Sequence, residues 1–136
     1  MIIIIIGLPA SGKTTYFQNN KELFKDYIFH DDFISNFFNG ELLNDINSGH
    51  NVCICDPRLC NITFFNKYIN IIKENDNYNN KIKLLLFENN KEKCLINAKS
   101  RNKKVDKTIE SLSQIYDINN YNHYDYEILE VYLKTN

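Results

Sequence analysis

The sequence has few of the residues that loosen a backbone: its 136 residues include only four glycines and two prolines. Each of these is therefore expected to hold a particular backbone position. An excess of charge is also lacking, because 16 Lys and Arg against 17 Asp and Glu leave a net charge of −1. This balance excludes a protein that coats long nucleic acid through its overall field, so any basic binding site must be local.

Long apolar runs are absent as well. The first run, Ile2–Ile6, is far shorter than the roughly 20 residues that cross a bilayer, and no basic segment precedes it, so we expect neither a membrane anchor nor a signal peptide. The four cysteines, Cys53, Cys55, Cys60 and Cys94, form no C-x-x-C pair, which disfavours zinc and favours free thiols. Free thiols indicate a reducing compartment, so we expect a cytoplasmic protein, or one of the host cytoplasm if it is viral.

The residues that are present predict a compact α/β domain. A hydrophobic content of 43% and a charged content of 24% are typical of a folded chain of one domain, residues 1–136. Short apolar runs predict strands over 2–6, 27–30, 52–55, 82–87 and, more weakly, 126–133. Helical spacing separates these runs. We therefore predict a three-layer sandwich with a central parallel sheet of four to five strands, the first of them central, flanked by helices.

Helical segments are predicted over residues 13–19 and 33–46, the second with an interruption at Asn39-Gly40. Two more are expected behind capping residues. Asn61 is expected to cap a helix that begins near Ile62, and Asp106 to cap a helix whose apolar stripe begins at Ile109.

A phosphate-binding motif lies between the first strand and the first helix. Residues 7–14, Gly-Leu-Pro-Ala-Ser-Gly-Lys-Thr, fit G-x-x-x-x-G-K-[ST] at every fixed position. Such a loop surrounds phosphates with backbone N–H groups at a helix N-terminus, while Lys13 reaches the β- and γ-phosphates and Thr14 ligates Mg²⁺. The predicted nucleotide-binding residues are Gly7, Pro9, Ala10, Ser11, Gly12, Lys13, Thr14 and Thr15.

The nucleotide is expected to be ATP rather than GTP. The segment after the third strand reads Asp56-Pro57-Arg58-Leu59 instead of D-x-x-G. The nearest guanine-recognition segment, Asn66-Lys67-Tyr68-Ile69, lacks the carboxylate that would accept hydrogen bonds from guanine.

Acidic residues follow the second and third strands, at the sheet edge where ligands bind in such folds. A kinase needs a carboxylate that accepts the proton of the acceptor hydroxyl. Asp31 is our candidate for this base and Asp32 the alternative, although this pair can also cap the next helix. Asp56 is the candidate for orienting Mg²⁺ or its water; the alternative is a cap before Pro57. His30, which precedes the acidic pair, is expected to be packed rather than catalytic.

A basic stretch follows the fourth strand. Residues 99–107 carry five positive charges, at the place where a mobile lid, residues 97–107, would cover the phosphates. Arg101 is one of only two arginines, and a guanidinium at this point would stabilise the transferring phosphoryl group. The alternative is a solvated charged helix face.

In this order, the features resemble the small P-loop kinases of the phage polynucleotide 5′-hydroxyl kinase type. The resemblance covers roughly residues 1–116 and rests on the motif at 7–15, Asp-Asp-Phe at 31–33, Cys-Ile-Cys-Asp at 53–56 and the lid stretch 97–105. It implies transfer of the γ-phosphate of ATP, with Mg²⁺, to the 5′-hydroxyl end of a polynucleotide. It also implies that Asp31, Lys13 and Arg101 are catalytic and that Thr14 and Asp56 serve the metal.

The chain departs from this pattern in the acceptor region and in the lid. Those kinases have an Arg that contacts the acceptor's phosphate three residues after the first Asp, and here the position is Ile34. In the lid, Ser100 stands where they have an arginine, and Arg101 follows it. Ile34 in place of the arginine favours a second possibility, a kinase for a small metabolite or nucleoside. A third is a non-catalytic ATP-binding regulatory module. The sequence gives no indication of the oligomeric state.

Overall fold

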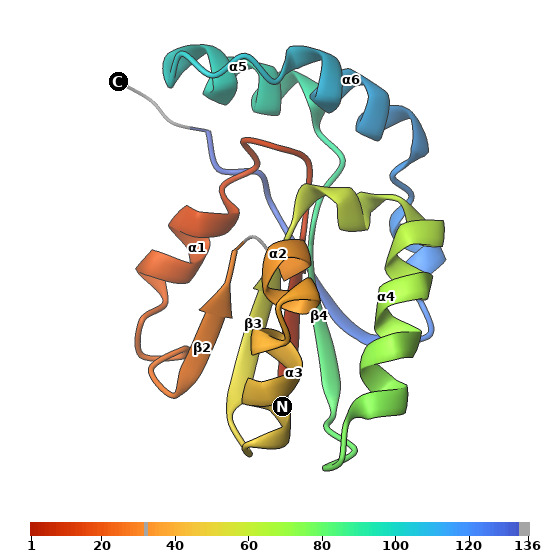
Figure 1. Cartoon of the computed structure of the whole chain (residues 1–136). Helices are drawn as coiled ribbons and strands as arrows, with labels where there is room; N and C mark the ends of the chain where they lie inside the picture. The colour runs from red at the N-terminus through yellow and green to blue at the C-terminus, as the bar shows by residue number, and fades with distance from the viewer. Residues whose placement is uncertain (32, 134–136) are drawn as a thin grey trace.

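The computed structural model describes residues 1–31 and 33–133, and it shows one parallel five-stranded sheet flanked by helices (Figure 1). The strands lie in the order β2-β3-β1-β4-β5, and every neighbouring pair is parallel. Their bounds are β1 Ile2–Ile6, β2 Tyr27–His30, β3 Asn51–Cys55, β4 Ile82–Phe87 and β5 Asp125–Leu129. The predicted α/β fold is therefore confirmed, with the first strand at its centre.

The fifth strand is shorter than the sequence predicts. β5 ends at Leu129, so the expected strand over 126–133 is wrong at its C-terminal end. The backbone N–H of Tyr132 instead donates to the carbonyl oxygen of Ser11 at 3.2 Å. The chain leaves the sheet at this point because its backbone pairs with the phosphate loop rather than with β4.

The helices fill the connections between the strands. Their bounds are α1 Lys13–Asn19, α2 Phe33–Phe38, α3 Glu41–Asn47, α4 Ile62–Asn75, α5 Lys91–Ser100 and α6 Asp106–Ile115, with 3-10 turns η1 Pro57–Cys60 and η2 Ile118–Tyr121. Asn61 caps α4 as predicted, because its side chain accepts from the backbone N–H groups of Thr63 and Phe64.

The predicted cap at Asp106 is wrong. Asp106 is the first residue of α6, its side chain makes no capping hydrogen bond, and Val105 holds the capping position. The reason is that the N–H of Ile109 already bonds to the carbonyl of Val105 at 2.9 Å, so the helix begins one residue earlier than expected. At this position the carboxylate of Asp106 acts only through its charge, which favours the helix N-terminus.

The helices cover both faces of the sheet. Phe17 of α1 stacks on Phe29 of β2 with ring centroids 4.2 Å apart. Phe65 and Ile69 of α4 meet Ile54 of β3. Phe29 is paired with Cys53, so these two side chains share a face of the sheet. The next residue of β3, Ile54, points to the other face, and α4 therefore packs on the face opposite to α1. α5 and α6 lie across the carboxyl ends of the strands (Figure 1), which places the predicted lid over the phosphate loop.

Candidate nucleotide-binding and phosphotransfer site

The phosphate loop joins β1 to α1 and has a tightly constrained backbone. Ala10 and Gly12 have φ of 64° and 103°, the left-handed conformation that turns successive N–H groups inward. A Cβ on Gly7 would lie 2.5 Å from the Oγ of Ser11 and 2.9 Å from the Cβ of Phe87. Only glycine therefore fits at position 7.

Lys13 lies inside this loop. Its side chain is 8% exposed, and its Nζ donates to the carbonyl oxygens of Gly7 at 2.9 Å and Leu8 at 2.7 Å and to the Oγ of Ser11 at 3.3 Å. Burial of a charge is costly unless it is hydrogen-bonded, and these three acceptors meet that need. The ammonium group thus forms a fixed positive charge at the centre of the loop.

One cavity of about 200 Å³ brings most of the predicted site residues together. Its lining comes from the loop and α1, from the end of β2, from η1 and from the lid: Pro9, Ala10, Gly12, Lys13, Thr14, Asp31, Pro57, Arg101, Lys103 and Val105. Thr15 lies beside it, because the Nη2 of Arg101 donates to the Thr15 Oγ1 at 3.4 Å. Asp32, the alternative base, lies outside the described residues.

Asp56 is arranged differently from the other predicted residues. Its buried carboxylate caps η1 by accepting from the backbone N–H of Arg58 at 2.8 Å. The guanidinium of Arg58 donates to the same carboxylate, from Nε at 2.9 Å and from Nη2 at 2.6 Å. Both oxygens are therefore engaged by one residue, and Pro57 rather than Asp56 lines the cavity. The geometry is that of the alternative stated for Asp56, a cap before Pro57.

The end of β2 is held in place by His30, which is 2% exposed. Its Nδ1 lies 2.7 Å from the Nδ2 of Asn36, and its Nε2 lies 2.9 Å from the Oδ2 of Asp45. An amide nitrogen only donates, so Nδ1 accepts and Nε2–H donates to the carboxylate. His30 is packed, as predicted, and it fixes α2 and α3 next to Asp31.

The predicted lid, residues 97–107, is anchored by Asn97, which is 2% exposed. Its Nδ2 donates to the carbonyl oxygen of Ala10 at 3.0 Å and to that of Tyr132. α5, the phosphate loop and the segment after β5 therefore meet at one side chain. Sequence reasoning assigned no role to Tyr132 and used Asn97 only as the start of the lid, because contacts between residues so distant in the chain leave no local pattern.

The turn that ends α5 sets the direction of two basic side chains. The N–H of Lys103 bonds to the carbonyl of Ala98 at 2.9 Å, and the N–H of Asn102 bonds to that of Lys99 at 3.1 Å. Asn102 has φ of 54°. These two bonds with a left-handed residue between them form a Schellman motif. Arg101 and Lys103 flank Asn102, and both line the cavity.

Three buried thiols lie behind the loop. Burial raises the pKa of Cys55 and Cys60 to about 12 and that of Cys94 to about 11, and in each case the charge of Lys13 opposes the shift. These thiols are therefore protonated near neutral pH and are poor nucleophiles. They are part of the buried core rather than a reactive group.

The described part of the chain contains neither a cluster of metal ligands nor a membrane-spanning helix. Among residues 1–31 and 33–133, no group of three or more His, Cys, Asp or Glu side chains is placed to hold a metal ion. In the same described part of the chain, no helix combines the length and the apolar character needed to cross a membrane.

Comparison with known proteins defines the fold and the family. No protein-family model matches the chain. Among solved structures, a gluconokinase from Sinorhizobium meliloti 1021 superimposes with a TM-score of 0.60 over 95% of this chain and 81% of that chain, at 11% identity. This likeness shows the P-loop kinase fold. Among curated proteins, uncharacterized protein R277 of Acanthamoeba polyphaga mimivirus is 41% identical over 134 residues, 96% of each chain. The chain therefore belongs to the same family as this mimivirus protein.

Proposed function

We propose that this protein is an ATP-dependent kinase that transfers the γ-phosphate of ATP to a hydroxyl group. The observation that supports it best is the cavity that holds the phosphate loop, the Lys13 ammonium, the Asp31 carboxylate and the Arg101 guanidinium together. These groups supply the functions that phosphoryl transfer needs, namely phosphate binding, a base and a counter-charge.

In this proposal the phosphates of the nucleotide lie in the loop and its base lies beside it. The phosphates bind the inward N–H groups of residues 7–13 and the Lys13 ammonium. A second cavity, of about 100 Å³, lies beside the loop and is lined by Gly12, Thr15, Tyr16, Asn19, Asn20, Phe87, Glu130 and Tyr132. The half-exposed ring of Tyr132 offers an aromatic face for a base, and the Glu130 carboxylate can accept from an exocyclic amine such as that of adenine.

Mg²⁺ would be held by the Thr14 hydroxyl together with phosphate oxygens, a hard-oxygen donor set that suits this ion. When bound, it neutralises the charge that develops on the β- and γ-phosphates. Asp56 would not contact the ion directly, because its two oxygens accept hydrogen bonds from Arg58. Its part is to hold η1, and with it Pro57, at the wall of the cavity.

In the proposed reaction Asp31 accepts the proton of the acceptor hydroxyl while that oxygen forms a bond to the γ-phosphorus. The bond from the γ-phosphorus to the bridging oxygen breaks, and ADP leaves. The Arg101 guanidinium stabilises the charge on the phosphoryl oxygens during transfer. Asp31 is exposed and lines the same cavity as Lys13, so a hydroxyl can approach it from solvent.

The acceptor that we propose is the 5′-hydroxyl end of a polynucleotide, which follows from the resemblance of residues 1–116. A small-metabolite hydroxyl is the second candidate, favoured by Ile34 and by the gluconokinase fold neighbour. The third, an ATP-binding regulatory module, predicts nucleotide binding without transfer.

Transfer of label from γ-labelled ATP to a panel of acceptors tests these proposals. The panel contains 5′-hydroxyl DNA and RNA oligonucleotides, nucleosides and sugar acids including gluconate. Label on the oligonucleotides supports the first acceptor, and label on a small molecule alone supports the second. Binding of ATP with no label on any acceptor would contradict the kinase proposal.

A further inference from the structure

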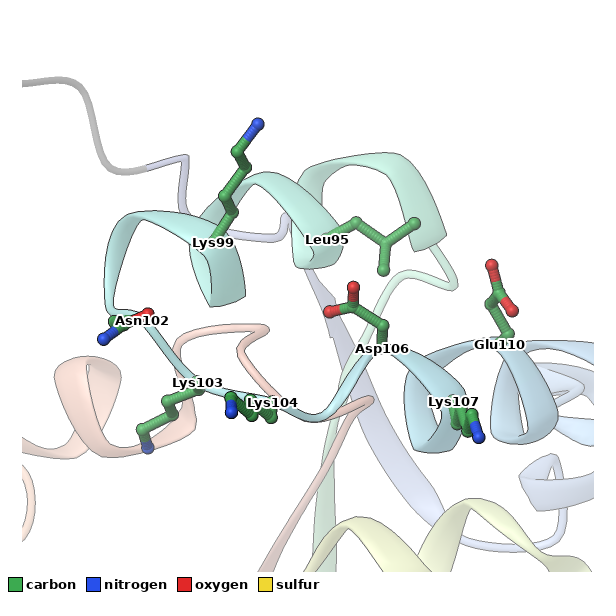
Figure 2. Close-up of a pocket in the computed structure, with 8 residues that line it drawn as sticks. All are labelled: Leu95, Lys99, Asn102, Lys103, Lys104, Asp106, Lys107 and Glu110. Carbon is green, nitrogen blue, oxygen red and sulfur yellow. The ribbon is translucent and has the colours of Figure 1, made fainter.

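A third and larger cavity, of about 550 Å³, lies in the predicted lid (Figure 2). It opens between α5 and α6 and is lined by Leu95, Lys99, Asn102, Lys103, Lys104, Asp106, Lys107 and Glu110. Figure 2 shows Lys103, Lys104 and Lys107 on the lower side of this cavity and Lys99 pointing away on the upper side. We call Lys103, Lys104 and Lys107 the lysine row.

The charges of the lysine row are not neutralised within the protein. All three side chains are exposed. None of the three ammonium groups makes a hydrogen bond or an ion pair with any residue in the described part of the chain. The nearby carboxylates of Asp106 and Glu110 point up into the gap between the helices (Figure 2). The row is therefore a surface with free positive charge.

The lysine row is continuous with the candidate active site. Lys103 lines both the cavity of the lid and the cavity that contains Asp31. The Schellman turn at Asn102 fixes the backbone of Lys103, and Lys104 and Lys107 follow it toward α6. A chain-like anion whose end lies at Asp31 would meet these cations in succession.

The segment around Asp31, which forms the acceptor side of the active site, contributes no lysine or arginine of its own. Residues 26–57, which run from β2 through Asp31, α2 and α3 to the end of β3, contain no Lys or Arg. The first cation after them, Arg58, is paired with Asp56. An acceptor that carries phosphates therefore depends on the lid for its counter-charges.

We propose that the lysine row binds the phosphodiester backbone of a single-stranded polynucleotide whose 5′-hydroxyl end lies at Asp31. This inference rests on the proposed kinase function and identifies the surface that holds its polynucleotide acceptor. Asp31 is exposed where it lines its cavity, so the terminal hydroxyl of a single strand can reach the carboxylate. The row then holds the phosphates that follow the terminal nucleotide, and each contact releases condensed counterions.

Binding measured without turnover tests the row directly. The probe is a 5′-hydroxyl oligonucleotide of about ten nucleotides, labelled at its 3′ end and followed by fluorescence anisotropy at several salt concentrations. The variant is Lys104→Gln/Lys107→Gln, which leaves Lys103 and the active-site cavity intact. The matched control is Lys21→Gln/Lys25→Gln, two exposed lysines in the turn before β2, at the opposite end of the sheet.

We expect the variant to bind roughly tenfold more weakly, with a salt slope reduced by about 0.7 for each lost contact, and the control to bind like the wild type. Equal affinity of variant and wild type would overturn the proposal. So would label transfer that is equally efficient with a nucleoside and with the oligonucleotide, although the kinase function would then stand. Specific binding through Lys104 and Lys107 without transfer to any acceptor supports the surface and contradicts the kinase function.

Discussion

Gly12 is constrained by its backbone and by a neighbour at the same time. Its φ of 103° is left-handed, and a Cβ at this position would lie 3.0 Å from the Cβ of Tyr132. We expect Gly12→Ala to destabilise the nucleotide-free protein by more than the roughly 1 kcal/mol that a left-handed alanine costs. Urea unfolding without nucleotide measures this loss.

Gly40 provides the matched control for that measurement. It is also left-handed, with φ of 83°, but a Cβ there would meet no atom within 4 Å. Gly40→Ala therefore carries the backbone cost alone. Equal losses for the two variants would show that the contact with Tyr132 contributes nothing.

Asp31 and Lys13 are expected to separate chemistry from binding. Asp31→Asn removes the proton acceptor at the cavity wall but leaves the loop and the Lys13 contacts unchanged. We therefore expect ATP affinity to be kept and the transfer rate to fall by orders of magnitude, whereas Lys13→Ala lowers both. Nucleotide titration and single-turnover transfer measure the two effects. A fully active Asp31→Asn variant would contradict the assignment of the base.

Residues with a local pattern were the ones that the sequence predicted well. The spacing of residues 7–14 placed Lys13 and Thr14 in the loop, and the end of the second strand placed Asp31 at the same cavity. The sequence did not predict the contacts made by Asn97, Tyr132 and Arg58. Asn97 and Tyr132 act through contacts across 87 and 35 positions of the chain, and the pairing of Arg58 with Asp56 depends on the tight turn of η1.

At the scale of elements, the sequence predicted four strands because each is a short apolar run that ends at a turn. The last strand was predicted too long because the apolar residues Val131 and Leu133 continue its pattern in the sequence, although the backbone of Tyr132 bonds to the loop. Asp106 was misplaced by one residue because a capping residue and a first-turn acid look alike in sequence; only the hydrogen bond to Val105 distinguishes them.

His30 connects three elements, and its removal tests that connection. His30→Ala would leave the side chains of Asn36 and Asp45 without their partner. We expect a loss of about 2 kcal/mol in the free energy of unfolding, since two hydrogen bonds of about 1 kcal/mol each are lost. We also expect a lower transfer rate, because α2 and Asp31 lose their support. Urea unfolding and the transfer assay measure these effects.

His50 is the control for this prediction because it is exposed. His50→Ala should change neither stability nor rate. Asp45→Asn keeps an oxygen that accepts from Nε2, so its loss should be smaller than that of His30→Ala. If His30→Ala and His50→Ala behave alike, the network does not hold α2 and α3.

At the scale of the whole molecule, the segment after β5 brings the C-terminal part of the described chain into contact with the phosphate loop near its N-terminus. Tyr132 lies against Gly12, its N–H bonds to Ser11, and its carbonyl accepts from Asn97. The phosphate loop is therefore supported on one side by the segment that follows the last strand. Loop, lid and this segment are expected to respond together when a nucleotide binds.

The four buried thiols make the stability of the whole fold depend on alkaline pH. Burial raises the pKa of every one of them above the ordinary value of 9.0, to about 11 for Cys94 and about 12 for Cys55 and Cys60, and upward for Cys53. Above that value the unfolded chain loses thiol protons that the folded protein keeps. The folded state then binds more protons, so stability must fall as pH rises.

This loss should be present above about pH 9 and absent below about pH 8, with up to about 1.4 kcal/mol per pH unit for each thiol that ionises only in the unfolded chain. Urea unfolding under reducing conditions measures it, and it is best followed below about pH 10, where unfolded tyrosines begin to ionise. Cys94→Ala removes one thiol and should reduce the slope by about one thiol's share, whatever it costs in stability at neutral pH. A stability that stays level across this range in the wild type would mean that the thiols are not buried as the fold requires.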